Sequence, residues 1–352
     1  MNAPTSPLAR AVVRRPAYSV PRAEAVTDLH LDANEGATPP PELLDAVGAP
    51  SAWRRYPDAA ALEAKLARRF GVEPSRVLVT AGADDALDRV CRAVLRPGDR
   101  AVFPEPGFAV MKHWIELAGA EAVSVPWPDG PYPTEAVLAE LGPRTPLVVV
   151  TSPNNPTGGV IDADGLRRLS EAARLVLLDG AYAEFADEDL TALALTLPNV
   201  MVVRTLSKAW GLASLRVGWA MATPEVVGWL RSAGLPYPVA GPSLAMASAA
   251  LDNEAPVRAF VERVRGERDA LSLVLRGIGA RPQRSQANFV LARVGDPLSW
   301  RDRLAAVGIA IRAFPGAPGL EDAVRITCPG DEAAFRRLVD ALQTQIGTET
   351  PR

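Results

Sequence analysis

Residues 200–211 read Val-Met-Val-Val-Arg-Thr-Leu-Ser-Lys-Ala-Trp-Gly, an apolar run followed by a cluster of hydroxyl, basic and small side chains. The apolar part is typical of a β-strand that is covered on both faces, as strands of a parallel sheet are. In open sheets of this kind, ligands bind just beyond the carboxyl ends of the strands. The stretch therefore predicts a buried strand with a chemically useful group, Lys208, just past its end.

Comparable apolar segments recur on both sides of this stretch and alternate with segments of helical periodicity. Uniformly apolar strands that alternate with helices are typical of a mostly parallel sheet covered on both faces. We therefore predict an α/β fold in which helices sandwich a mostly parallel central sheet. The expected strands are residues 76–80, 100–103, 122–125, 147–151, 175–178, 200–204 and 217–221, and the expected helices are residues 39–48, 59–70, 83–95, 108–118 and 164–174.

The composition and pattern of the sequence change after about residue 245, where we expect a long helix rich in arginine and glutamate. The chain has 352 residues, which is enough for two domains. We expect a large domain over residues 37–244, and a smaller α+β domain over residues 245–352 with an irregular N-terminal arm, residues 1–36. In the smaller domain we expect helices at 255–275, 300–307 and 331–345, and strands at 288–292, 309–312 and 323–327.

Composition narrows the classes of function. The net charge of −3 provides no broad positive field for nucleic acid or an anionic membrane. No apolar run reaches the roughly 18 residues of a membrane helix, and residues 1–21 lack the apolar core of a secretion signal. Cys91 and Cys328 form no disulfide framework, and with the two histidines they offer no metal-ligand spacing. We therefore expect a cytoplasmic protein with no bound metal, no nucleic-acid partner and no membrane association.

Two expected strand ends carry small and polar residues that suit a bound ligand. Residues 80–85, Thr-Ala-Gly-Ala-Asp-Asp, combine small side chains with the start of a helix, whose free N–H groups attract phosphate. A plain strand–turn–helix with an aspartate cap is the alternative. Residues 151–159, Thr-Ser-Pro-Asn-Asn-Pro-Thr-Gly-Gly, form a long polar string, for which an ordinary turn is the alternative.

Two further strand ends carry a carboxylate and an amine. Asp179 follows the apolar segment 175–178, where a buried carboxylate is costly unless a cation such as a protonated ring nitrogen lies beside it; a helix cap is the alternative. Lys208 is one of only three lysines among 38 basic residues. Schiff-base chemistry needs the free amine, and a partly desolvated cleft would lower the pKa of a lysine enough to provide it. A lysine on the protein surface is the alternative. An amine, a carboxylate and anion-binding groups together suit pyridoxal 5′-phosphate.

The chain resembles the fold-type I aminotransferases and, within them, the histidinol-phosphate aminotransferase family of class II pyridoxal-phosphate-dependent aminotransferases. The resemblance runs nearly from end to end, from residues 31–35, Leu-Asp-Ala-Asn-Glu, to residues 325–327, Arg-Ile-Thr. Its most specific pieces are residues 152–158, and residues 204–209 followed by 215–218.

The resemblance implies roles for the residues around the cofactor ring. Lys208 would form the Schiff base and act as the general base between the substrate α-carbon and cofactor C4′, and Asp179 would keep the pyridine nitrogen protonated. Asn155 and Tyr182 would hydrogen-bond the ring hydroxyl. Phe108 falls where the family usually stacks a tyrosine on the ring, so it keeps the stacking surface and lacks the hydroxyl.

The resemblance also implies how the cofactor phosphate and the substrate are held. Arg325 would grip the anionic group of the substrate and Arg312 would take a substrate phosphate, because arginines make bidentate contacts to such groups. Tyr18 in the arm, Asn34 and Asn288 are the other candidates near the substrate. The cofactor phosphate is expected to contact Ala83, Asp84, Thr205, Ser207 and Arg216, together with Tyr56 of a neighbouring subunit, which implies a homodimer with shared active sites.

Three departures from the family pattern bear on the substrate. Gly180 stands where the family commonly has a glutamate after the strand-end aspartate, at a position that should not touch the core chemistry. Residues 313–315, Ala-Phe-Pro, are more apolar than the polar stretch expected beside a phosphate. Together with Phe108, they leave an aromatic or other amino acid open as the substrate.

The sequence therefore predicts a pyridoxal-phosphate aminotransferase that works by ping-pong half-reactions, with L-histidinol phosphate as donor and 2-oxoglutarate as acceptor in histidine biosynthesis. An aminotransferase for aromatic or other amino acids is the first alternative. A decarboxylase of a phosphorylated amino acid is the second. A non-enzymatic binding or regulatory module is the third, although every expected catalytic position is filled.

Overall fold

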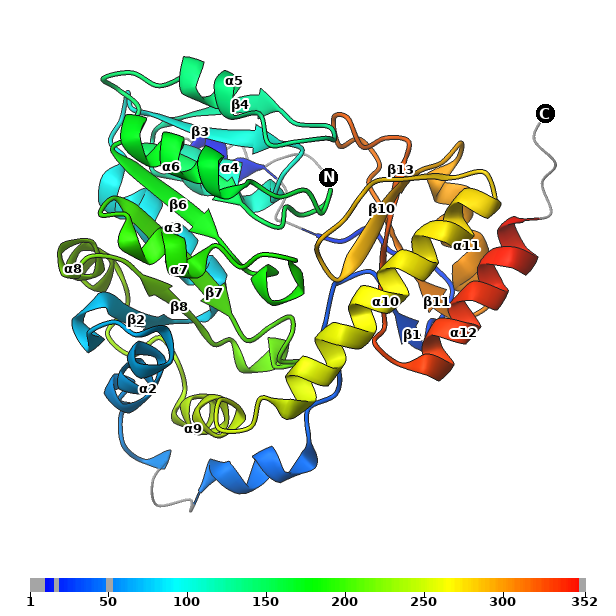
Figure 1. Ribbon diagram of the computed structural model, residues 1–352, viewed down its shortest axis with the longest axis horizontal. Coiled ribbons are helices and arrows are strands. Elements are labelled where there is room, and N and C mark those ends of the chain that lie inside the picture. The colour runs from blue at the N-terminus through cyan, green and yellow to red at the C-terminus, as the bar shows by residue number, and fades with distance from the viewer. Residues whose placement is uncertain (1–9, 16–18, 49–52, 348–352) are drawn as a thin grey trace.

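The structure, a computed structural model, describes residues 10–15, 19–48 and 53–347. Its central element is a seven-stranded sheet with the order β2-β8-β7-β6-β5-β3-β4 (Figure 1). All pairs among β3, β4, β5, β6 and β7 are parallel, whereas β8 runs antiparallel to both of its neighbours. The predicted mostly parallel sheet is confirmed. The strands are β2 Val77–Thr80, β3 Arg100–Glu105, β4 Glu121–Pro126, β5 Leu147–Thr151, β6 Leu175–Asp179, β7 Val200–Thr205 and β8 Gly218–Met221.

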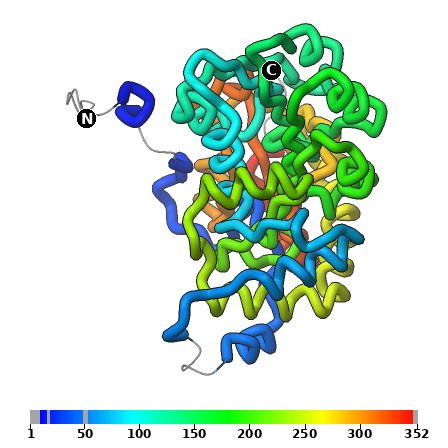
Figure 2. Tube along the Cα trace, turned by 90° about the vertical axis from the view of Figure 1, so that its left-hand side faces the viewer, coloured from blue at the N-terminus to red at the C-terminus, as the bar shows by residue number. Residues whose placement is uncertain are grey.

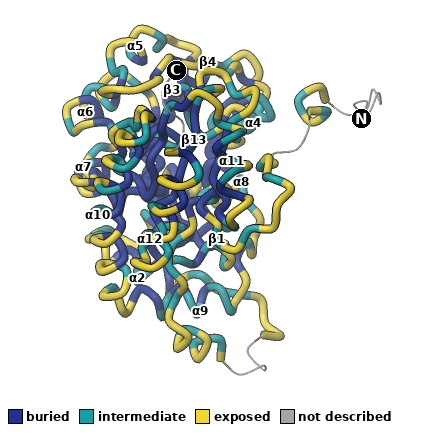
Figure 3. The backbone as a smooth tube through the Cα atoms, turned by 90° about the vertical axis from the view of Figure 1, so that its right-hand side faces the viewer, coloured by how far each residue is buried: buried dark blue, intermediate teal, exposed yellow. Residues whose placement is uncertain are grey.

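Alternate residues of the central strands point to opposite faces of the sheet, and each face has its own core. In β5, Val148 and Val150 belong to one core, while Leu147 and Val149 belong to the other. Both faces are covered, which is why the sequence shows strands that are apolar at every position; Figure 3 shows the buried strands inside the more exposed helices. Helices α2 Ala60–Phe70, α5 Thr134–Ala139, α6 Ala163–Ala172 and α7 Thr191–Thr196 contribute to the first core, and α3 Gly82–Val94, α4 Ala109–Leu117 and α8 Pro224–Ala233 to the second.

A smaller antiparallel sheet follows, with the order β12-β13-β10-β9. Its strands are β9 Arg281–Pro282, β10 Phe289–Arg293, β12 Arg312–Ala313 and β13 Ala323–Thr327, and the accompanying helices are α10 Ala255–Gly277, α11 Pro297–Ala306 and α12 Glu332–Ala341. Figure 1 shows α10 running along this sheet toward the large one. Although α10 has 23 residues, it carries too many charges to cross a membrane, and the other helices in the described chain do not qualify either.

The N-terminal segment is built into the small-sheet region rather than left irregular. β1, Leu29–His30, pairs in parallel with β11, Ile309–Ala310. The backbone N–H of Thr327 then donates to the Leu31 carbonyl at 3.0 Å. This corrects the prediction of a single strand at residues 309–312. The segment is divided into two short strands with different partners, because β11 pairs with β1 and β12 pairs with β13.

Several helices differ from the sequence-based expectations. α5 and α7 have six residues each, too few to display a helical period. α9, Gly241–Ala250, consists almost entirely of small and apolar residues and so lacks a polar face that would reveal its period. α8 begins at Pro224 and is followed by Gly234, signals that could have revealed it. The helix expected at residues 39–48 is a 3-10 helix, Pro41–Val47, which packs against α9 at one end of the molecule (Figure 2).

Candidate active site

Parallel strands bring chemically active residues to one edge of the large sheet. Thr151 at the end of β5 lies opposite Asp179 at the end of β6, and Asp179 lies opposite Val203 of β7. A cavity of about 300 Å³ opens beyond this edge. It is lined by Val20, Asp32, Ala33, Asn34, Ala83, Asp84, Leu87, Phe108, Thr151, Asn155, Asp179, Ala181, Tyr182, Thr205, Ser207, Lys208, Arg216 and Arg325.

Lys208 follows β7 and presents its amine to this cavity. Its Nζ donates to the carbonyl oxygen of Ala33 at 3.1 Å and lies 5.7 Å from the centre of the Tyr182 ring. A carbonyl oxygen accepts a hydrogen bond from a neutral amine as well as from an ammonium group. The contact therefore holds Lys208 in place without requiring it to be charged, and a neutral amine is the form that acts as a nucleophile or a base.

Asp179 is a carboxylate at the buried end of β6, with only 5% of its surface exposed. Its Oδ1 accepts a hydrogen bond from the backbone N–H of Ala181 at 3.1 Å. Burial raises the pKa of Asp179 to about 7, against the lowering effects of the Ala181 N–H and of Lys208. A carboxylate in this position is ready to accept a cationic partner inside the cavity.

The first turn of α3 and the loop after β7 form a cradle for an anion. The hydroxyl of Thr205 donates to Oγ of Ser207 at 2.9 Å, and Nη1 of Arg216 lies 3.4 Å from the same oxygen. A Cβ atom on Gly82 would lie 2.6 Å from Nη2 of Arg216, and the φ of Gly82 is +78°. Only glycine therefore allows the helix N-terminus and the guanidinium to approach this closely, and both attract phosphate.

The opposite side of the cavity is tied to the small sheet. Arg325 of β13 donates from Nη1 to Oδ1 of Asn155 at 2.5 Å and from Nη2 to the Asp32 carbonyl at 2.6 Å. Asn34 donates from Nδ2 to the Tyr182 hydroxyl oxygen at 3.0 Å. The Asn34 side-chain oxygen in turn accepts a hydrogen bond from the hydroxyl of Thr327 at 2.9 Å. Residues from both sheets and from the N-terminal segment thus converge on one cavity.

Three of the predicted site residues that the structure describes, Arg312, Tyr56 and Asn288, do not line this cavity. Arg312 lies directly opposite Arg325 in the β12–β13 pair and is 9% exposed. Tyr56 is 81% exposed and stacks on Tyr237, with ring centres 4.7 Å apart. Tyr18 lies outside the described residues. Asn288, also predicted near the site, contacts it through Nδ2, which donates to the Asn34 carbonyl at 3.2 Å.

Sequence reasoning assigned no individual role to several lining residues. Thr151 is the last residue of an expected strand and Leu87 lies one helical turn after Ala83, so both had a positional signal. Ala33 and Asp32 contribute backbone carbonyl oxygens, which no side-chain pattern reveals. Val20 and Ala181 line the cavity without any signal that we recognise in the sequence.

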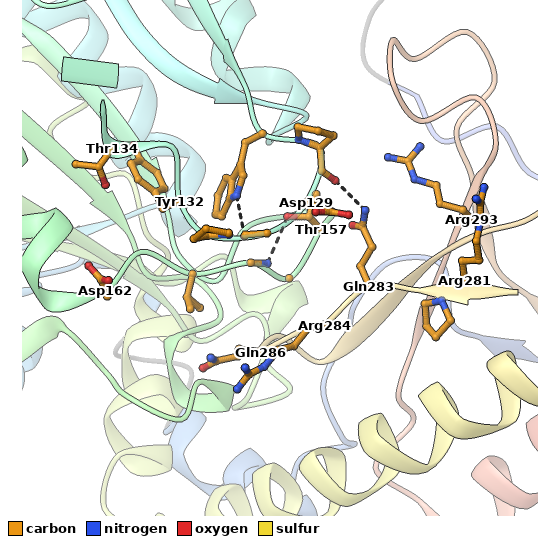
Figure 4. Close-up of a pocket in the computed structure, with 18 of the residues that line it drawn as sticks. Asp129, Tyr132, Thr134, Thr157, Asp162, Arg281, Gln283, Arg284, Gln286 and Arg293 are labelled. Atoms are coloured by element: carbon orange, nitrogen blue, oxygen red, sulfur yellow. Dashed lines mark hydrogen bonds between the residues drawn. The ribbon is translucent and has the colours of Figure 1, made fainter. Parts of the chain in front are cut away.

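A second and larger cavity, of about 900 Å³, lies between the loop after β4 and the loop after β9. Figure 4 shows Arg281 and Arg293 on one side of it, with Tyr132 and Asp162 on the other. Two of its charged groups are engaged locally: Arg293 pairs with Asp322 at 2.5 Å, and Asp162 accepts a hydrogen bond from the backbone of its own helix. We therefore assign the chemistry to the cavity around Lys208.

Comparisons with known proteins match this chain to one enzyme family. The model of the family described as aminotransferase class I and II matches residues 26–342. Histidinol-phosphate aminotransferase of Dinoroseobacter shibae is 36% identical over 332 residues, covering 90% of each chain. That of Ruegeria pomeroyi is 34% identical over 327 residues, again covering 90% of each chain.

Solved structures point the same way. The histidinol-phosphate aminotransferase of Sinorhizobium meliloti in complex with pyridoxal 5′-phosphate superimposes with a TM-score of 0.83, 28% identity and 91% coverage of both chains. An aspartate aminotransferase of Thermus thermophilus with maleate superimposes with a TM-score of 0.76 and 25% identity, covering 91% of this chain and 92% of that one.

Proposed function

The chain belongs to the aminotransferase class I and II family, and we propose that it uses pyridoxal 5′-phosphate to transfer the amino group of L-histidinol phosphate to 2-oxoglutarate. The observation that carries the proposal is the position of Arg325, which lines the same cavity as Lys208 and Asp179 and has Arg312 directly opposite on the neighbouring strand. Two guanidinium groups beside an amine suit a substrate that carries both an amino group and a phosphate. The relatives named histidinol-phosphate aminotransferase support the same substrate.

The side chains around the cavity suit the charged groups of pyridoxal phosphate. Lys208 would bind the aldehyde, the buried Asp179 would pair with the ring nitrogen, and Phe108 would stack on the ring. The cradle at Gly82 would receive the phosphate, which Ala83, Asp84, Thr205, Ser207 and Arg216 would contact. When bound, the cofactor supplies an electron sink that stabilises negative charge at the substrate α-carbon.

The hydrogen bonds already made by Asn155 and Tyr182 define what these residues can offer the cofactor. Asn155 accepts from Arg325 through Oδ1, so its Nδ2 amide remains to donate into the cavity. Tyr182 accepts from Asn34, so its own hydroxyl proton remains to be donated. We assign both donors to the ring hydroxyl of the cofactor.

Lys208 is assigned the proton transfer. With the cofactor bound, Nζ of Lys208 would take the proton from the substrate α-carbon and would return it within the same site. The Ala33 carbonyl holds Nζ near this position at 3.1 Å. Arg325 and Arg312 hold the anionic end of the substrate, and Asn34 and Tyr18 complete the proposed substrate contacts.

We propose a homodimer with shared active sites in the cytoplasm. The supporting observation is the exposed apolar surface at the Tyr56–Tyr237 stack, where Tyr56, Tyr237 and the neighbouring Leu235 are 81%, 54% and 74% exposed. Exposed apolar patches of this kind commonly mark protein interfaces. In such a dimer Tyr56 would reach the cofactor phosphate of the other subunit. We further propose that residues 37–244 form the cofactor-binding domain, and residues 1–36 with 245–352 the arm and the small domain.

An aminotransferase for aromatic or other amino acids is the second candidate. Phe108 lines the cavity, and the Phe314 ring lies within 6 Å of both substrate arginines, at 5.4 Å from Arg312 and 5.9 Å from Arg325. These rings would also suit an apolar substrate side chain.

The visible spectrum of the purified holoenzyme tests both candidates. We expect L-histidinol phosphate alone to abolish the yellow colour of the lysine-linked cofactor, and 2-oxoglutarate to restore it. If saturating histidinol phosphate leaves the spectrum unchanged and an aromatic amino acid abolishes the yellow colour, the second candidate is correct and the first is wrong.

A further inference from the structure

A single buried hydroxyl group, that of Thr327, meets Asn34 at two points. Thr327 ends β13 and is 2% exposed. Its Oγ1 accepts a hydrogen bond from the backbone N–H of Asn34 at 3.2 Å, and its hydroxyl donates to Oδ1 of Asn34 at 2.9 Å. The position of Thr327 is itself fixed, because its backbone N–H donates to the Leu31 carbonyl at 3.0 Å and it lies opposite Phe289 in the β10–β13 ladder. The small sheet therefore holds both the backbone and the side chain of Asn34.

The backbone contact leads to the amine of Lys208. The N–H of Asn34 and the carbonyl of Ala33 belong to one planar peptide group. This carbonyl accepts from Nζ of Lys208 at 3.1 Å, so Lys208 and Thr327 bind the two polar ends of the same peptide. Because hydrogen bonds in series polarise one another, the bond to Thr327 also strengthens the carbonyl as an acceptor. Thr327 thus contributes to both the direction and the strength of the contact that holds the amine.

The side-chain contact determines which way the Asn34 amide faces. Oγ1 of Thr327 already accepts from a backbone N–H, and among the described residues Oδ1 of Asn34 is the one acceptor within reach of its proton. With Oδ1 used in this way, Nδ2 faces Tyr182 and donates to its hydroxyl oxygen at 3.0 Å. An amide nitrogen accepts no hydrogen bond, so the Tyr182 proton is left for another acceptor.

Asn34 needs this support because its backbone lies in the left-handed region, with a φ of +57°. Residues other than glycine rarely adopt this conformation, although asparagine does so more readily than most. The Asn34 carbonyl also accepts from Nδ2 of Asn288 at 3.2 Å, so its backbone and side-chain polar groups all have partners. Because Asn34 is 2% exposed, a contact that is lost here is not replaced by bulk water.

We propose that Thr327 is a positioning residue that directs two groups of the site from one hydroxyl. Through the peptide between Ala33 and Asn34 it places the Lys208 amine, and through the Asn34 side chain it turns the Tyr182 proton toward the cofactor. Thr327 does not line the cavity and acts through Asn34. The inference rests on the roles that the proposed function gives to Lys208 and Tyr182, and it adds a residue outside the cavity on which both depend.

The experiment compares Thr327→Val, which keeps the shape of the side chain and removes the hydroxyl, with Thr327→Ser, which keeps the hydroxyl. The first measurement is the visible spectrum of the holoenzyme from about pH 5 to pH 10 without substrate, because the lysine-linked cofactor changes colour when it loses its proton. A donor held against the ring oxygen stabilises its negative charge, so without that donor the proton is retained to higher pH. We expect the midpoint of the colour change to rise by about one pH unit in Thr327→Val, a 10-fold change in the proton equilibrium, and to return to the wild-type value in Thr327→Ser.

A double-mutant cycle determines whether Thr327 acts through Tyr182. Tyr182→Phe removes the phenol hydroxyl, so it should raise the midpoint by itself, and Thr327→Val should then add no further rise. The effect on Lys208 is followed by exchange of the α-proton of L-glutamate, the amino acid that corresponds to 2-oxoglutarate, in deuterated water. We expect Thr327→Val to lower the kcat of exchange about 10-fold, less than the loss of the base itself, with less than about a 3-fold change in KM. The same decrease should appear in the Tyr182→Phe background.

Thr145→Val is the matched control, because Thr145 is also buried, at 3% exposed, and its hydroxyl donates to the Glu140 carbonyl at 3.4 Å, away from the cavity; neither measurement should change. If Thr327→Val does not fold, Thr327→Ala takes its place in the cycle. The inference is wrong if the midpoint stays at the wild-type value, if serine restores no more than valine does, or if the effects of Thr327→Val and Tyr182→Phe on the midpoint add in full. A wild-type enzyme that does not exchange L-glutamate would instead contradict the proposed acceptor, and the titration without substrate would still decide the role of Thr327.

Discussion

Arg325 donates a hydrogen bond to Oδ1 of Asn155 across the junction of the two sheets, at 2.5 Å. Under the proposed assignment, one arginine would contact the substrate and would also orient an amide that faces the cofactor. A change at Arg325 should then affect substrate binding and the hydrogen bond to the cofactor together.

Replacing Arg325 with lysine tests whether the planar geometry of the guanidinium matters in addition to its positive charge. Lysine keeps the positive charge but cannot span Asn155 and Asp32 with a planar fork. We expect the KM for both donor and acceptor to rise about 10- to 100-fold, the size of a lost charge-assisted hydrogen bond. Steady-state kinetics with each substrate varied in turn measures this. Arg293→Lys, on neighbouring β10 and paired with Asp322 outside the cavity, is the matched control; an equal effect there would contradict the assignment.

The scarcity of lysine offers a clean test of the proposed catalytic amine. Lys208→Ala removes the proton carrier, and we expect transamination to slow by about 10³-fold or more. The absorbance of the covalently linked cofactor should disappear as well. Lys65→Ala serves as the control, because Lys65 is occupied by Asp252 and by the Ser248 carbonyl. A Lys208→Ala enzyme with wild-type turnover would end the mechanism proposed above.

Asp179 should make the stability of the cofactor-free protein depend on pH. Its pKa rises from 3.8 to about 7 on burial, so between these values the folded chain holds a proton that the unfolded chain has released. The free energy of unfolding therefore falls as pH increases through this window, by on the order of 4 kcal/mol in total. Asp179→Asn removes this penalty, and the variant apoprotein should be more stable than the wild type at pH 8.

Urea unfolding of both apoproteins at pH 4, 6 and 8 measures the difference. The advantage of Asp179→Asn should be smallest at pH 4 and should level off above pH 7. A difference that stays constant with pH would show that the carboxylate does not carry the effect.

A buried arginine next to the site should be essential to stability rather than to catalysis. Arg204 is 3% exposed and binds Glu184 at 2.9 Å, Asp189 at 2.7 Å and Thr191 at 2.7 Å. Arg204→Met leaves two acidic groups without their cation, and we expect a loss of about 3–5 kcal/mol in the free energy of unfolding.

Chemical denaturation compares this variant with Arg336→Met. Arg336 and Glu332 form an exposed pair, with 69% and 74% of their side chains accessible, so the control should change stability by less than about 0.5 kcal/mol. Comparable losses in the two variants would mean that the buried network contributes little.

Local patterns were sufficient to single out two residues that the structure brings to one cavity. Asp179 ends, and Lys208 follows, a strand that begins with four apolar residues, and parallel strands end at one edge of a sheet. The direction of β8 could not be predicted, since four apolar residues carry no sign of their orientation. The backbone contacts of Ala33 and Asp32 depend on tertiary folding and have no counterpart in side-chain type.

The contacts of the proposed substrate residues were harder to predict from the sequence, because they also depend on tertiary folding. Arg312 and Arg325 were predicted as a pair from the family resemblance, and their register across β12 and β13 emerges only in three dimensions. Phe314 looked like an apolar departure in the sequence, whereas the structure shows its ring against both guanidinium groups. A pattern along the chain reports burial, but it does not report which cation a buried ring will meet.

The pairing of β1 with β11 has a consequence for how the protein is made. Leu29 leaves the ribosome early, but its partner Ile309 is synthesised near the end of the chain. The N-terminal strand must therefore wait, without its sheet partner, until almost all of the molecule has been translated. Because Ala33, just beyond this strand, accepts the hydrogen bond of the Lys208 amine, we expect this contact in its final geometry only after most of the chain has been synthesised.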